Sequence, residues 1–149
     1  MHTDIELLKS IDLFEDLTPE EMEKILSLLS PIRVTEGEML IRRGQPAHTF
    51  FIVLSGNYML YFKKGRAFTL HKKGDIIGRS TIIAPFHYTA TAIALTKGEV
   101  LSMSGREFLR LIQGDSALGD KIMKKINRFI GKKIPFFKGM DLSEYKSAT

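Results

Sequence analysis

The chain has 149 residues, a net charge of +5, 44% hydrophobic and 26% charged residues, a composition typical of a soluble globular domain. It contains no cysteine, which excludes disulfide bonds and thiolate metal sites. No apolar run reaches the roughly 18 residues of a membrane-spanning helix. The first residues lack the basic and apolar regions of a signal peptide, so we expect a cytoplasmic protein.

The N-terminal residues have the pattern of two helices. A short helix is predicted over residues 3–9, and an apolar connector follows over residues 11–17. Thr18 can cap a second helix, Pro19 suits its first position, and Glu21 completes a capping box. The apolar residues of this helix fall on one face, and Ser30-Pro31 is expected to end it.

Eight short segments rich in β-branched or aromatic residues follow, and glycines separate them. The segments are 32–35, 39–42, 48–54, 58–63, 67–71, 76–77, 88–95 and 100–103. Short strands joined by tight turns at this spacing indicate an antiparallel sandwich or barrel.

Two further helices are predicted after the strands. Ser104 can cap the first over residues 105–113, and the second runs over about 115–134, where a proline ends it. Its seam of Ile122, Ile126 and Phe129 has coiled-coil spacing, so it packs either on the barrel or against a second copy. Residues 120–138 contain seven Lys or Arg and one acid. We interpret them as a solvated helix face, with nucleic acid or a lipid surface as the alternative partner.

Residues 37–56 resemble the opening strands of the cyclic-nucleotide-binding domain family, to which catabolite activator protein and the regulatory subunits of protein kinase A belong. The family pattern begins with Gly-Glu, an apolar pair and Arg-x-Gly, which match Gly37-Glu38, Leu40-Ile41 and Arg42-Arg43-Gly44 here. An aromatic and apolar strand that ends at a glycine follows in the family, and residues 50–56 match it. Residues 13–18 and 108–112 match the family's lead-in and B helix.

The resemblance covers about residues 5–134. It implies a mostly β fold: an eight-stranded antiparallel jelly-roll (double-stranded β-helix) barrel with N-terminal helices and C-terminal B and C helices. It also implies a regulatory role rather than a catalytic one.

Residues 74–91 have the outline of the family's phosphate-binding cassette, where backbone N–H groups of a short helix point at a cyclic phosphate. In the family, a Glu after the cassette glycine accepts from the ribose 2′-hydroxyl. An Arg nine or ten residues later pairs with the phosphate, and Ser/Thr and Ala follow. Gly78, Thr89 and Ala90 match this pattern, but Arg79 holds the Glu position and Tyr88 holds the Arg position.

Both substitutions remove the chemistry that binds the nucleotide. A guanidinium only donates hydrogen bonds, and tyrosine cannot neutralise a phosphate. Since each charge-assisted hydrogen bond contributes ~1.5–3 kcal/mol, losing the arginine weakens binding by about one to a few powers of ten.

Three interpretations of the cassette remain open. It is vestigial, and Ile82, Ile83, Phe86 and Tyr88 only pack. It binds another small anion through Arg79, because a cation in a first helical turn is unfavourable without an anionic partner. A carboxylate of the chain, such as Glu99, could equally be that partner. Or it binds cAMP or cGMP weakly. The candidate ligand-binding residues are Gly78, Arg79, Ser80, Tyr88, Thr89 and Ala90.

The C-terminal helix closes over the base in relatives, and Asn127 is the lid candidate, with an exposed asparagine as the simpler interpretation. Enzymes on jelly-roll scaffolds need a His-x-His pair, and the four histidines of this chain form none. No catalytic residue and no metal ligand is therefore predicted. Too few residues follow the last helix for a helix-turn-helix, so direct DNA binding is not expected.

We predict a non-enzymatic regulatory or sensor module over residues 1–134, with weak, altered or lost cyclic nucleotide binding. The alternative is a structural domain that binds a protein partner or a second copy through helix 115–134. Residues 135–149 form a C-terminal tail. Because residues 134–140 echo the lead-in at 11–17, the tail is a candidate for the start of a further domain.

Overall fold

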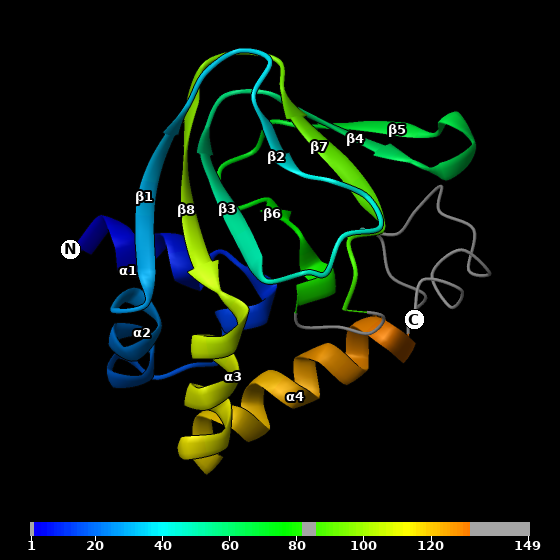
Figure 1. Ribbon diagram of the computed structural model, residues 1–149. Coiled ribbons are helices and arrows are strands. Elements are labelled where there is room, and N and C mark those ends of the chain that lie inside the picture. The colour runs from blue at the N-terminus through cyan, green and yellow to red at the C-terminus, as the bar shows by residue number, and fades with distance from the viewer. Residues whose placement is uncertain (1, 82–85, 132–149) are drawn as a thin grey trace.

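The structure is a computed structural model that describes residues 2–81 and 86–131, and it contains two four-stranded antiparallel sheets (Figure 1). One sheet has the strand order β1-β8-β3-β6 and the other β2-β7-β4-β5. The strands are β1 Leu29–Val34, β2 Met39–Ile41, β3 Thr49–Ser55, β4 Tyr58–Phe62, β5 Ala67–Leu70, β6 Ile76–Ile77, β7 Ala90–Ala94 and β8 Gly98–Ser104. This interleaved order is that of a jelly roll, so the fold class expected from the sequence is confirmed.

The N-terminal helices are α1 His2–Lys9, the 3₁₀ turn η1 Asp12–Phe14, and α2 Pro19–Leu26. The capping box of α2 is confirmed: Glu21 N donates to Thr18 Oγ1 at 3.2 Å, and Thr18 N donates to Glu21 Oε1 at 2.9 Å. The helix ends at Leu26, earlier than expected, and Pro31 lies inside β1. The strand tolerates this proline because β1 is an edge strand that pairs only with β8.

The C-terminal helices are α3 Gly105–Gly114 and α4 Ser116–Gly131, and they pack below the sheets beside the N-terminal helices (Figure 1). Ser104 Oγ accepts from Glu107 N at 3.3 Å, as the predicted cap requires. On α4, Ile122 is 0% exposed and Ile126 is 4% exposed, and both join the core. These two residues of the predicted seam therefore pack inside the molecule; the side chain of Phe129 lies outside the described part.

One large hydrophobic core joins the helices to the first sheet. Phe108 of α3 makes edge-to-face ring contacts with Phe50 of β3 at 5.6 Å and with Phe14 of η1 at 6.3 Å. A second cluster fills the space between the sheets and includes Tyr58, Ile77 and Tyr88. The cassette thus lies between the two cores.

The basic face of α4 is partly internal, which corrects the expectation of a solvated face. Lys125 is 3% exposed and pairs with Glu15 and, at 3.3 Å, with Asp16. Lys121 pairs with Glu21 at 2.7 Å. The sequence could not indicate this arrangement, because the partners lie in the turn after η1 and on α2, about a hundred residues away. No helix in the described ranges is long and apolar enough to cross a membrane.

Candidate functional site

The cassette turn forms at Gly78, between the end of β6 at Ile77 and the start of the 3₁₀ turn η3 Arg79–Thr81. Gly78 has φ +91°, a left-handed conformation that favours glycine. A Cβ here would lie 3.1 Å from Thr49 O and 3.3 Å from Tyr88 Cε1. The turn, the Tyr88 ring and the start of β3 are therefore in close contact, and a side chain on Gly78 would crowd them.

Tyr88, which the sequence predicts at the position of the family's arginine, is 7% exposed and held by hydrogen bonds of its hydroxyl and of its backbone. Its hydroxyl donates to Thr49 O at 2.6 Å and accepts from Thr49 N at 3.1 Å. In the backbone, Tyr88 N donates to Gln45 O at 2.9 Å, and Gly44 N donates to Tyr88 O at 2.8 Å. Tyr88 thus joins the turn before β3 to the first residue of β3, and β7 begins two residues after it, at Ala90.

Arg79, which the sequence predicts at the position of the family's glutamate, interacts electrostatically with two carboxylates. Its Nε is buried although the residue as a whole is only partly buried. Burial lowers the pKa of Arg79 to about 10, while Asp12 and Asp75 act in the opposite direction. The guanidinium is therefore charged at neutral pH.

The carboxylates that act on Arg79 are not the one named from the sequence. Asp12 belongs to η1, and Asp75 precedes β6. Glu99 lies opposite Ser55, at the far end of β3 from the Thr49 contact with the cassette turn. The acidic groups that raise the pKa of Arg79 thus belong to the N-terminal turn and the β5–β6 loop, and sequence spacing could not indicate them.

The remaining candidate residues are spread around this turn. Thr89 is partly buried, and Ala90, 5% exposed, lies opposite Phe62 at the start of β7. Ser80 belongs to η3, but its side chain lies outside the described part, as do Ile82 and Ile83. The lid candidate Asn127 is exposed on α4.

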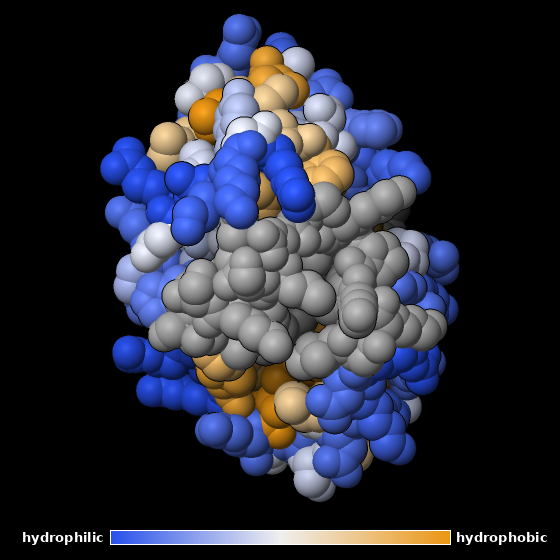
Figure 2. All heavy atoms as spheres, turned by 90° about the vertical axis from the view of Figure 1, so that its right-hand side faces the viewer, coloured by the Kyte–Doolittle hydropathy of each residue, from blue (hydrophilic) through white to orange (hydrophobic). Residues whose placement is uncertain are grey.

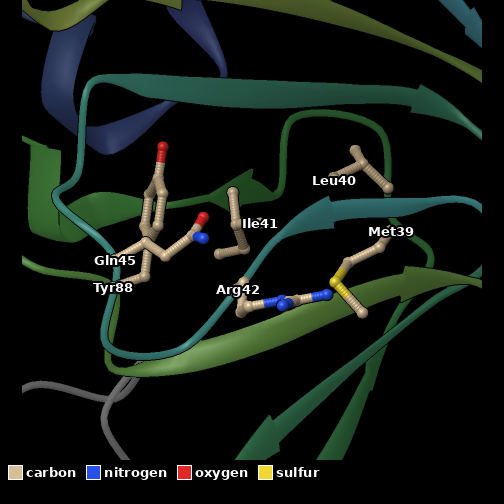
Figure 3. Close-up of a pocket in the computed structure, with 6 residues that line it drawn as sticks. All are labelled: Met39, Leu40, Ile41, Arg42, Gln45 and Tyr88. Atoms are coloured by element: carbon tan, nitrogen blue, oxygen red, sulfur yellow. The ribbon is translucent and has the colours of Figure 1, made fainter.

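A pocket of about 370 Å³ lies beside Tyr88 (Figure 3). It is lined by Met39, Leu40, Ile41, Arg42, Gln45 and Tyr88. Of the residues predicted from the sequence, Tyr88 alone lines it. Sequence reasoning missed the others because residues 39–42 have the pattern of an ordinary strand; the available signal was the polar pair Arg42 and Gln45 around Gly44.

Metal ligands do not gather within the described residues: no three His, Asp or Glu side chains there could hold an ion. The candidate site therefore consists of the cassette turn, Tyr88 with its contacts to β3, and the neighbouring pocket.

Residues 31–115 match the family model of the cyclic nucleotide-binding domain. The chain is 31% identical over 108 residues to a cAMP-dependent protein kinase regulatory subunit of Colletotrichum orbiculare, covering 72% of this chain and 28% of that protein. It thus spans less than a third of the length of that relative.

The fold is also similar to solved structures. One is the regulatory subunit of a cAMP-independent protein kinase A from Trypanosoma brucei, with a TM-score of 0.72, 20% identity, and coverage of 90% of this chain and 46% of that chain. A triple mutant of the same protein, described as bound to cAMP in its A site, has a TM-score of 0.68, 21% identity, and coverage of 85% and 46%. The match over residues 31–115 and the jelly-roll strand order establish that this chain belongs to the cyclic nucleotide-binding domain family.

Proposed function

We propose that the chain is a non-enzymatic regulatory module whose cassette binds cyclic nucleotide weakly or not at all. The observation that carries this proposal is Tyr88. It takes the place of the phosphate-binding arginine, and both hydrogen-bonding directions of its hydroxyl are used by the Thr49 backbone. Turning Tyr88 towards a ligand would break these bonds and would still supply no positive charge.

Arg79 supports the same proposal. A glutamate at this position would accept a hydrogen bond from the ribose, whereas the guanidinium of Arg79 can only donate. The neighbouring Asp12 and Asp75 favour its charged form. The cassette therefore lacks both side chains through which the family recognises the nucleotide, although it keeps Gly78, Thr89 and Ala90.

The Trypanosoma brucei protein offers a precedent for the experiment. That protein is described as a regulatory subunit of a cAMP-independent kinase, and its cAMP-bound mutant carries three substitutions, one of which introduces an arginine. A comparable restoration in this chain is the double variant Arg79→Glu, Tyr88→Arg.

Isothermal titration calorimetry with cAMP and cGMP tests the proposal. We expect the natural chain to show no affinity in the micromolar range, and the double variant to bind at least about tenfold more tightly, since it regains a charge-assisted pair. The matched control is Arg43→Glu, Tyr61→Arg, the same exchanges at exposed positions, which should not restore binding. Micromolar or tighter affinity in the natural chain would contradict the proposal, as would a folded double variant that does not bind.

The alternative, a partner-binding domain acting through helix 115–134, is less favoured. Ile122 and Ile126, which would form the contact, are buried in the chain's own core. The face of α4 that remains available carries Met123, which is 44% exposed, and the exposed Lys124 and Asn127.

A further inference from the structure

We propose that the pocket beside Tyr88 binds a small organic anion, a carboxylate or phosphate group carried on an apolar body. The pocket shares Tyr88 with the cassette, but Gly78, Arg79, Thr89 and Ala90 are not among the residues that line it. Its volume of about 370 Å³ lies within the range of small-molecule sites. The proposal does not depend on whether the cassette binds cyclic nucleotide.

The pocket follows the open edge of β2. Met39, Leu40 and Ile41 are consecutive in β2, and side chains alternate between the two faces of a strand. A pocket that contacts all three must therefore lie along the strand's edge. Within the described residues, β2 is the end strand of its sheet and pairs only with β7, so no strand there pairs with its other edge. Ile41, 5% exposed, and Tyr88, 7% exposed, form the apolar inner wall.

Two polar side chains stand over this apolar wall. Figure 3 shows the Arg42 side chain extended along β2 towards Met39, and the Gln45 amide beside Tyr88 and Ile41. Among the described residues, neither Arg42 nor Gln45 has a side-chain hydrogen bond or an ion pair. Guanidinium matches carboxylate and phosphate in shape and charge, and an amide can donate a further hydrogen bond.

The backbone holds these two residues in place. Gln45 N donates to Arg42 O at 3.2 Å and closes the turn between them. The two backbone hydrogen bonds between this turn and Tyr88 then fix it against the pocket wall. The backbone of the site is thus fixed before any ligand arrives, which reduces the backbone entropy lost on binding.

The stretch of the sequence that contributes the pocket residues is net basic. Residues 39–98 contain nine Lys or Arg and one acid, Asp75, whereas residues 1–38 contain three Lys or Arg and ten acids. Glu15, Asp16 and Glu21 of that N-terminal part pair with lysines of α4. Figure 2, which views the side towards which the β4–β5 hairpin projects, shows strongly hydrophilic residues beside hydrophobic ones there. The pocket residues 39–45 and Tyr88 belong to this net basic stretch of the sequence, which favours an anionic over a cationic ligand.

NMR titration of the full ¹⁵N-labelled chain tests the site. Benzoate and phenyl phosphate serve as anionic probes, and benzamide is the uncharged counterpart of benzoate. We expect both anions to shift the amides of residues 39–45 and Tyr88 at millimolar concentration, and benzamide to bind at least about tenfold more weakly. Arg42→Gln should lower the affinity for both anions about tenfold or more, while leaving benzamide unchanged.

The matched control is Arg43→Gln, which removes the same charge from the adjacent exposed residue that does not line the pocket. It should change affinity no more than about twofold, because Arg43 does not line the pocket and salt screens the field of a charge outside it. Equal binding by Arg42→Gln and the natural chain would overturn the proposal, and so would the absence of shifts. Shifts at Gly78 and Arg79 without shifts at residues 39–45 would place the anion in the cassette and also overturn it, independently of the calorimetry with cyclic nucleotides.

Discussion

The Tyr88 hydroxyl makes two hydrogen bonds with the backbone of one residue: it donates to Thr49 O and accepts from Thr49 N. Tyr88→Phe keeps the ring in place and leaves both backbone groups of Thr49 without this partner. We expect the free energy of unfolding to fall by about 1–3 kcal/mol, the usual cost of leaving buried polar groups unpaired. Urea unfolding followed by circular dichroism measures the change.

Tyr61→Phe is the control, since Tyr61 is 41% exposed. The free energy of unfolding of this variant should differ from that of the natural chain by no more than about 0.5 kcal/mol, as for most surface substitutions. If both variants lost the same stability, Tyr88 would not be the structural link between the cassette and β3 that the hydrogen bonds indicate.

From the sequence we predict that Arg79 and Tyr88 replace the two nucleotide-binding side chains of the family, because the cassette is a local segment whose spacing is visible. The contacts of these two residues could not be predicted in this way. Thr49 lies 39 residues before Tyr88 and reaches it only because β3 and the cassette turn meet in the folded sheet. In the same way, the carboxylates near Arg79 come from η1 and the β5–β6 loop, and the pocket depends on an open strand edge that no residue pattern marks.

Among the elements, α4 is held to the N-terminal helices by ion pairs that respond to pH. The hydrogen bond from Lys121, together with that from the Thr18 backbone, lowers the pKa of Glu21 below its ordinary value of 4.5. A carboxyl whose pKa is lower in the folded state stabilises the fold above its unfolded pKa. This stabilisation is lost as the pH falls from about 4.5 through the folded pKa.

When the pH is lowered from neutral to about 3, we therefore expect the free energy of unfolding to fall less in the Glu21→Gln variant than in the natural chain. Glutamine can still accept from Thr18 N, so the cap of α2 is kept. Urea unfolding at a series of pH values measures the difference. Glu23→Gln is the control: Glu23 is exposed and makes no side-chain bond in the described part of the chain. Identical pH profiles for the two variants would show that the Glu21–Lys121 pair is not the acid-sensitive contact.

The elements themselves were largely accessible from the sequence. Turn glycines and β-branched runs predicted all eight strands, and the capping residues predicted the starts of α2 and α3. The exceptions have physical reasons. Pro31 indicated a break, yet an edge strand needs no N–H there. The lysines of α4 suggested solvent, yet their partners lie on another helix far along the chain.

At the scale of the whole molecule, the helices and the first sheet share one core, so the site and the helices should unfold together. Thr49, which holds Tyr88, is followed in β3 by Phe50, and the Phe50 ring contacts Phe108 of α3 at 5.6 Å. Phe14 of η1, which is 0% exposed, contacts Phe108 from the other side. A change at the start of β3 is therefore directly connected to the helices that a regulatory module would use.

Phe14→Ala tests this coupling. It should lower the free energy of unfolding by about 3–5 kcal/mol, as is usual for a buried phenylalanine, while unfolding remains a single transition. Native-state hydrogen exchange should show the same loss of protection in β3 and in α4, because both depend on one core. Phe68→Ala is the control: Phe68 is half-buried against Phe62 in a separate small cluster, so its loss should be smaller. If α4 lost protection while β3 kept it, the helices would form an independent unit, and a ligand beside Tyr88 would have no route to them through this core.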